Sequence, residues 1–179
     1  LTEMDLTETG DAVNVGTISY TRNVGDYLTL YVSPAGGGAG SALFTKACTY
    51  EGQTNVLDDC GNRWTFMDNG ASSAFSSSIE LDNGLSAAVG YEGVDDWRGL
   101  GTAESGSDLY GINIAYTKDT YGVSYTFTDY ETNEHQAINA FFTPGIDGLP
   151  SISVGLEWAH FDGIADDQDE SSHYFFGAQ

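Results

Sequence analysis

Basic residues are almost absent from this chain of 179 residues, which has 5 Lys and Arg against 27 Asp and Glu. With a formal net charge of −22, little in the chain could replace the counterions of a nucleic acid, so we expect no nucleic-acid partner. The same balance disfavours docking on an anionic membrane surface and favours cations as partners. A charge that serves solubility alone explains the composition equally well at this stage.

Long hydrophobic runs and proline are scarce as well. No run of about 18 apolar residues occurs, so the sequence contains no candidate transmembrane helix. Proline occurs 3 times, whereas Gly occurs 23 times, Tyr 11 times and Phe 9 times, which favours strands and turns over helices. A membrane β-barrel stays open, because each of its strands carries a much weaker signal than a helix does. The length suits a single domain over residues 1–179.

Motifs of catalysis are missing too. The sequence has no G-x-S-x-G, no phosphate-binding loop, no H-E-x-x-H and no C-x-x-C. Its two cysteines, Cys48 and Cys60, flank a polar stretch, and we predict a local disulfide, which suits an oxidising compartment; free thiols are the alternative. We assign no catalytic residue and predict that the chain is not an enzyme.

Short segments that alternate apolar and polar residues fill most of the sequence. They include Phe75–Leu81, Leu85–Tyr91, Tyr110–Tyr116 and Tyr121–Phe127, and this period of two predicts strands. We predict nine to eleven strands and no long helix. The first strand changes parity, so a β-bulge is expected near Gly16.

The connections between these segments alternate between tight turns and longer polar loops. Asp82-Asn83-Gly84 and Lys118-Asp119-Thr120 predict tight turns, whereas 92–108 and 129–136 predict long loops. One edge of the sheet would then have tight turns and the other long acidic loops, which is the asymmetry of transmembrane β-barrels.

The two faces of the predicted strands differ in the size of their side chains. Ile112, Ile114 and Val123 would lie on one face, and small uncharged residues such as Ala115 and Ser124 on the other. Large apolar groups outside and small polar groups inside are the pattern of a barrel. We therefore predict an all-β, antiparallel up-and-down transmembrane β-barrel. A secreted acidic β-sandwich that binds cations or carbohydrate is the alternative, because its strands alternate as well.

Candidate functional residues follow from this arrangement. The candidate pore-lining residues on the small-residue face are Glu80, Glu157 and Asn113, with water-exposed strand ends as the alternative for the glutamates. An acidic mouth is predicted from Asp95, Asp96, Glu104, Asp129, Glu131, Asp166, Asp167, Asp169 and Glu170. His160, Asp162 and His173 are candidate metal ligands, against the bland alternative of a solvated acidic loop. A loosely bound divalent cation is the one cofactor considered.

Three segments carry a resemblance to a known family. They are 15–30, which is similar to an early barrel hairpin of that family, Leu85–Tyr91, and 149–155 followed by an acidic loop and the aromatic residues 174–176. Together they resemble the barrel part of the cyanobacterial outer-membrane porins. In that family an S-layer-homology domain and a coiled coil precede a carbohydrate-selective, OprB-like barrel, and some members are called iron-uptake porins.

The resemblance implies passive diffusion of small solutes and inorganic ions, iron included, across an outer membrane, with the lipid bilayer as partner. The sequence contains neither the S-layer-homology domain nor the coiled coil. Its strand count is also below the roughly 16 to 18 of open aqueous pores, so we expect part of a larger barrel. A small structural or adhesive outer-membrane barrel without a pore is the alternative. Homotrimer formation is left open.

Overall fold

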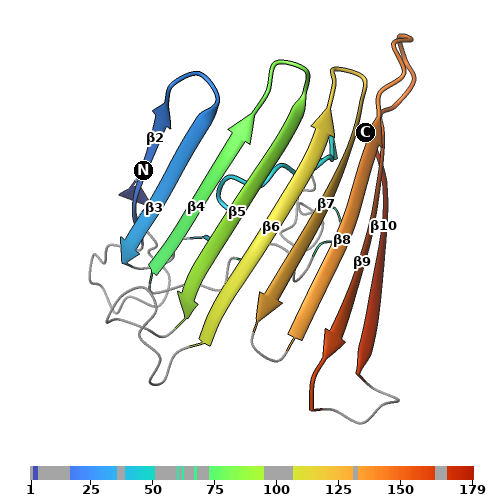
Figure 1. The fold of residues 1–179 in the computed structure, drawn as a ribbon. Helices are drawn as coiled ribbons and strands as arrows, with labels where there is room; N and C mark the ends of the chain where they lie inside the picture. Colours follow the sequence, from blue (N-terminus) through green and yellow to red (C-terminus); the bar gives the residue numbers. More distant parts are fainter. Residues whose placement is uncertain are drawn as a thin grey trace, which may run out of the picture.

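The computed structural model of the chain is an all-β fold built on one antiparallel sheet (Figure 1). It describes residues 2–3, 17–35, 39–50, 60, 62, 67, 73–94, 107–130, 133–163 and 169–179. The strand order in the sheet follows the chain from β1 to β10, so every neighbouring pair is antiparallel and consecutive in the sequence. The described residues include no helix that is long and apolar enough to cross a membrane.

Nine strands of 8 to 11 residues make up the sheet, and a two-residue strand extends one edge. They are β1 (Thr2–Glu3), β2 (Thr17–Val24), β3 (Leu28–Ala35), β4 (Ser73–Glu80), β5 (Leu85–Val94), β6 (Ser107–Thr117), β7 (Tyr121–Tyr130), β8 (Asn133–Phe142), β9 (Ile152–Phe161) and β10 (Glu170–Ala178). The prediction of an all-β antiparallel meander is confirmed.

A β-bulge interrupts the pairing of β2 with β3. Ile18 pairs with Ala35 and Tyr20 pairs with Val32, so β3 has one residue more than β2 in this interval. The additional residue falls at Ser33 and Pro34, and proline has no N–H to give to the ladder. Ser33 Oγ donates instead to the Ile18 carbonyl at 2.9 Å. The bulge expected near Gly16 lies outside the described residues.

The expected asymmetry of the connections is present in part. On one edge, 25–27, 81–84 and 118–120 join strands by tight turns, and the longer 143–151 leaves from the same edge. The connections 36–72, 95–106 and 162–169 all leave from the opposite edge. The long loop expected over 129–136 is wrong: Asp129 pairs with Glu134 and Tyr130 with Asn133, so β7 and β8 continue almost to their connection.

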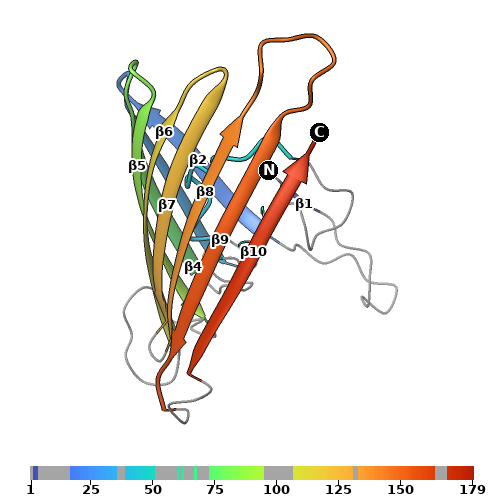
Figure 2. The same ribbon diagram turned by 90° about the vertical axis from the view of Figure 1, so that its right-hand side faces the viewer.

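The sheet is curved rather than flat, and segment 39–50 lies on its concave side (Figure 2). It is not closed, because β1 and β10 stand at opposite ends of the strand order and do not pair. Of the expected up-and-down β-barrel, the described residues thus show the antiparallel up-and-down sheet, which is open and curved; they do not show a closed barrel.

The packing of the β4–β5 turn against β6 can be tested by mutation. Gly84 has φ of 91° there, and a Cβ would collide with the Thr117 carbonyl of β6, which belongs to the next hairpin. We expect Gly84→Ala to lower the free energy of unfolding by about 1–3 kcal/mol, measured by urea titration in detergent. Gly145→Ala is the matched control, since no atom lies within 4 Å of the added methyl. Equal midpoints for the two variants would contradict the turn geometry.

Candidate functional site

The sheet buries its small and polar face and exposes its large apolar face, whereas a soluble antiparallel sheet does the reverse. The concave face carries small or polar residues that are buried, among them Ser76, Ser86, Ala88, Asn113, Ala115, Ser124, Thr126, Ala137, Asn139, Ser153 and Glu157. The convex face carries large apolar residues that are exposed: Ile112 is 44% exposed, Val123 47% and Phe176 71%. Soluble antiparallel sheets bury the apolar face and expose the polar one.

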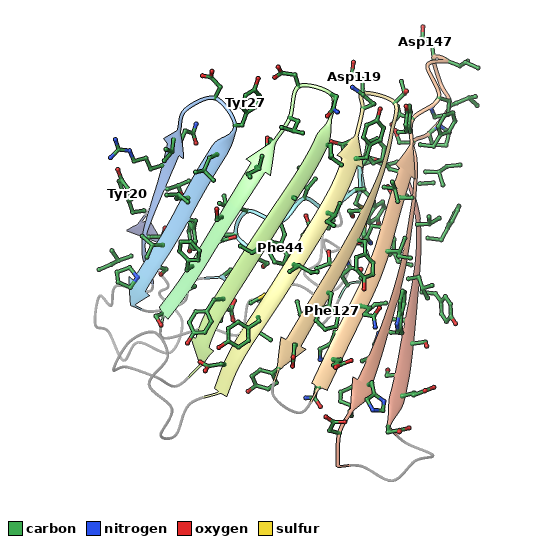
Figure 3. All side chains as sticks on the ribbon, viewed as in Figure 1. Tyr20, Tyr27, Phe44, Asp119, Phe127 and Asp147 are labelled. Carbon is green, nitrogen blue, oxygen red and sulfur yellow. A yellow bond between two sulfur atoms is a disulfide. The ribbon has the colours of Figure 1, made fainter. Side chains whose placement is uncertain are left out.

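Segment 39–50 covers the concave face by crossing the strands. At its start, Gly40 N donates to Glu92 Oε1 of β5 at 2.6 Å. At its end, the Tyr50 ring lies 5.4 Å from the Phe175 ring of β10, measured between centroids. Between them Phe44 lies beneath β5 and β6, against Gly90 and Gly111 (Figure 3). One extended segment thus spans six strands.

Every second backbone N–H in the middle of this segment donates to a polar side chain of the sheet. The pairs are Thr45 N with Asn113 Oδ1 at 2.8 Å, Ala47 N with Ser124 Oγ at 3.0 Å and Thr49 N with Ser153 Oγ at 3.0 Å. Extended chain alternates its N–H groups with a period of two, so three donors face the sheet in turn. Short polar side chains of the sheet therefore accept the backbone hydrogen bonds that a neighbouring strand would otherwise accept.

Asn113 makes the most complete of these contacts. Its Nδ2 donates to the Thr45 carbonyl at 3.1 Å while its Oδ1 accepts the Thr45 N–H, so one amide pairs both backbone groups of Thr45. Nδ2 also reaches Thr126 Oγ1 at 2.9 Å. Such amide pairing leaves neither side of the contact unsatisfied, which is the condition for burying polar groups without a large cost.

Glycines on the concave face let backbone approach backbone. A Cβ on Gly90 would collide with the Gly40 carbonyl, and a Cβ on Gly155 would collide with the Cys60 carbonyl. Any larger residue at either position would push the covering chain off the sheet. The glycines are therefore part of the construction of this face.

A disulfide joins Cys48 and Cys60, as predicted. Cys60 is fully buried, and its carbonyl accepts a hydrogen bond from Asn139 Nδ2 at 3.4 Å. Asn62 and Asn139 exchange amide hydrogen bonds of 2.6 and 3.1 Å. The disulfide thus ties segment 39–50 to a second point of contact, on β8.

The three candidate pore-lining residues occupy different places. Asn113 and Glu157 lie in the middle of β6 and β9 on the concave face and are each 1% exposed. Asn113 holds the covering segment, whereas Glu157 lies opposite His173 in the register of β9 with β10. Glu80 shares the parity of this face, but it is exposed at the end of β4 beside the tight turn.

The predicted acidic mouth is described in part. Asp129, Asp169 and Glu170 lie at the edge of the sheet from which the longer connections leave. Six of the residues predicted for the acidic mouth lie outside the described part of the chain: Asp95, Asp96, Glu104, Glu131, Asp166 and Asp167. The described strands on either side of these residues end at this same edge.

The three candidate metal ligands are not brought together. His160 Nε2 lies 3.5 Å from Asp162 Oδ1, and His160 Nδ1 lies 3.9 Å from Asp169 Oδ2. His173 is in register with Glu157 and therefore lies on the concave face, whereas His160 is in register with Glu170 on the convex face. No group of three potential ligands that could hold a metal ion occurs among the described residues.

Sequence reasoning missed the residues that hold the covering segment. Glu92 was expected at the start of a loop, but it continues β5 and is fully buried against Gly40. Ser124 and Ser153 were counted only as small residues of one face. The sequence did show that small polar residues such as these recur at every second position, between large apolar residues. Segment 39–50, which they bind, has no periodic pattern that would have predicted the contact.

Comparison with known proteins adds no assignment. No family model, no curated protein and no solved structure matches the chain. The resemblance to cyanobacterial porins therefore remains a prediction from the residues quoted for it, and the geometry of the two faces is the basis for the function proposed below.

The Asn113 contact generates a test of the covering segment. We expect Asn113→Ala to lower the free energy of unfolding by about 1–3 kcal/mol, because the backbone N–H of Thr45 loses its acceptor in a partly buried position. The same variant should be cleaved faster by protease within 39–50. Asn23→Ala is the control: Asn23 accepts from Thr29 Oγ1 at an exposed site, and its loss should cost less than about 0.5 kcal/mol. Equal costs for the two variants would show that segment 39–50 is not held this way.

Proposed function

We propose that the chain forms part of the wall of an outer-membrane, porin-type channel for passive diffusion of small solutes and inorganic ions, with an acidic mouth that favours cations. The observation that carries the proposal is the exposed apolar band on the convex face, combined with the small polar residues on the concave face. A surface of this kind suits lipid tails outside and a hydrated or filled interior inside.

Strand length supports the proposal. Strands β5 to β10 have 9 to 11 residues, which is about the length that a tilted strand needs to cross a bilayer. On β6 the exposed apolar residues Tyr110, Ile112 and Ile114 follow one another at every second position. An apolar patch that continues over so many strands is far larger than a soluble monomer leaves in water.

The stagger of the apolar band supports it further. One hydrogen-bonded row crosses the convex face from aromatic to charged residues. It contains, in order, Tyr91, Tyr110, Asp129, Glu134, His160 and Glu170. At the other edge of the sheet, the row of Tyr121, Phe142, Ile152 and Ala178 is apolar throughout.

The apolar band therefore climbs relative to the rows between β5 and β10. Hydrogen-bonded rows run perpendicular to the strands. Over the five strand intervals from β5 to β10, the border of the band shifts along the strand direction by about four residues, which corresponds to a slope of roughly 30°. A band that is level in a membrane has this slope when the strands are tilted, and barrel strands are tilted by about 35–45°.

Aromatic pairs mark both borders of the band. Tyr116 and Tyr121 lie 6.1 Å apart beside the tight turns, and Tyr91 and Tyr110 lie 5.2 Å apart near the opposite edge. Tyr91 OH donates to Asp108 Oδ1 at 2.5 Å, so its polar end meets a charge. Tyrosines with an apolar body and a wet tip are characteristic of the membrane interface.

Closure of the barrel is part of the proposal. The described strands form a curved sheet with two edges, so we propose that further strands complete the wall. The β-sandwich alternative requires a second sheet over the convex face, and the described ranges contain a single sheet that leaves this face exposed.

A barrel without a pore is the second candidate, and one observation favours it. Segment 39–50 crosses the concave face from β5 to β10 and buries side chains that would otherwise line a lumen, such as Asn113 and Ser124. In the porin-type proposal this segment narrows the channel; in the poreless one it fills the interior.

Conductance separates these two candidates. Full-length protein reconstituted in planar bilayers should give channel steps with cation preference, and Glu80→Gln should reduce the reversal potential because Glu80 is exposed on the concave side. Glu157→Gln should have the smaller effect, since Glu157 is buried. Asp147→Asn is the control and should leave selectivity unchanged, because Asp147 is exposed at the tip of the 143–151 connection, away from the concave face (Figure 3). The absence of any steps would remove the channel and leave the filled barrel.

The lipid-facing assignment has its own test. Ile112→Arg should destabilise the protein in phospholipid vesicles by about 2–4 kcal/mol, because the guanidinium would enter the hydrocarbon region. Ile146→Arg is the matched control: Ile146 lies in the 143–151 connection and is exposed, so its replacement should cost little. Urea titration of vesicle-bound protein measures both. If both variants stay folded and monodisperse in buffer without detergent, the convex face is not a lipid surface.

A further inference from the structure

A shallow groove of about 250 Å³ interrupts the convex face over strands β5 to β8. Its walls include Leu85, Ile114, Tyr116, Val123, Tyr125 and Ile138. The groove exists because small residues stand among large ones: Val123 is in register with Tyr116 on one side and with Ala140 on the other. Tyr116 and Tyr125, which are large, border the depression.

One end of the groove carries a positive charge. Lys118 Nζ lies 5.7 Å from the centroid of the Tyr116 ring, so its ammonium group stands where the groove meets the tight turn. Lys118 is exposed and is the only Lys or Arg in the described parts of β5 to β8 and their connections. Below it the wall residues occupy two successive outward rows, roughly 7 Å along the strands. The arrangement is an apolar groove with a cation at one end.

We propose that this groove binds one phospholipid, with an acyl chain along Val123 and the phosphate at Lys118. The proposal rests on the proposed function, because it needs the convex face to lie in a bilayer. Under that condition the tyrosine pair of Tyr116 and Tyr121 marks the headgroup level, which brings Lys118 to the depth of a phosphate. An anionic headgroup is favoured, since the ammonium meets it directly.

A second copy of the chain fits the groove less well than a lipid does. A stable protein–protein interface buries at least about 1,200 Å² and needs matching surfaces, whereas this depression has room for a short stretch of one acyl chain. The acidic balance of −22 also repels another copy, while it leaves Lys118 as a local exception.

Native mass spectrometry tests the assignment. Full-chain protein is reconstituted in vesicles of phosphatidylcholine and phosphatidylglycerol, extracted in a mild detergent, and its retained phospholipid is counted. We expect one retained phospholipid, enriched in phosphatidylglycerol. Val123→Trp, which fills the groove, should reduce retention at least about fivefold. Val89→Trp is the matched control, because Val89 is 51% exposed on the same face and lies outside the groove walls.

A second pair of variants tests the headgroup contact. Lys118→Gln should keep the acyl chain bound but remove the enrichment of phosphatidylglycerol over phosphatidylcholine. Arg22→Gln, an exposed cation on β2 and away from the groove, should leave that enrichment unchanged. An unchanged ratio in Lys118→Gln would overturn the headgroup assignment.

Protease protection in the same vesicles separates this inference from the channel proposal. Wild-type protein that inserts but retains no more lipid than Val123→Trp overturns the lipid site and leaves the channel standing. Protein that inserts and gives no channel steps, but retains lipid in the wild type and loses it in Val123→Trp, supports the lipid site and overturns the channel. Protein that does not insert overturns both. If Val123→Trp instead dissociates an oligomer and leaves lipid retention unchanged, the groove belongs to a second copy and the lipid assignment fails.

Discussion

Pairing of the backbone groups of segment 39–50 by side chains is the interaction on which the rest of the arrangement depends. A buried N–H or carbonyl without a partner is costly, and a chain that crosses strands at a steep angle cannot pair with their backbone. Asn113, Ser124 and Ser153 supply the missing partners, and Gly90 and Gly155 supply the room. Because this face must remain small and polar, the large side chains of the same strands are left on the convex face.

That division explains why charge and hydrophobicity coexist in one chain. The mean hydropathy of −0.25 belongs to a polar protein, yet the convex face carries an apolar band across successive strands. Acidic residues concentrate where strands end, such as Asp129 and Glu170, and one pair of tyrosines lies at each border of the band. The proposed channel and the proposed lipid site use the two faces of one sheet: in these proposals the covered concave face would narrow or fill the interior, and the exposed convex face would meet lipid.

Much of the sheet could be predicted from local pattern. Alternation in Tyr110–Tyr116 and Tyr121–Phe127, with a turn at Lys118, determined both the hairpin and its two faces, because the side-chain period of a strand is two and a tight turn leaves little freedom of register. The stretch 129–136 misled for a physical reason: its polar residues lie at the charged end of β7 and β8, where strands continue beyond the apolar band. The polar residues of 129–136 therefore lie where the apolar band ends, whereas the strands themselves continue.

By itself, the sequence determined the strands, the tight turns, the division of large and small residues between faces, and the Cys48–Cys60 pairing across a short polar stretch. These follow from interactions between residues that are near one another in the chain. Only the tertiary structure decided that segment 39–50 crosses six strands, that Glu92 is buried against Gly40, and that His160 and His173 lie on opposite faces. Those contacts join residues far apart in sequence through side-chain-to-backbone hydrogen bonds, and such bonds leave no periodic trace in the segment that they hold.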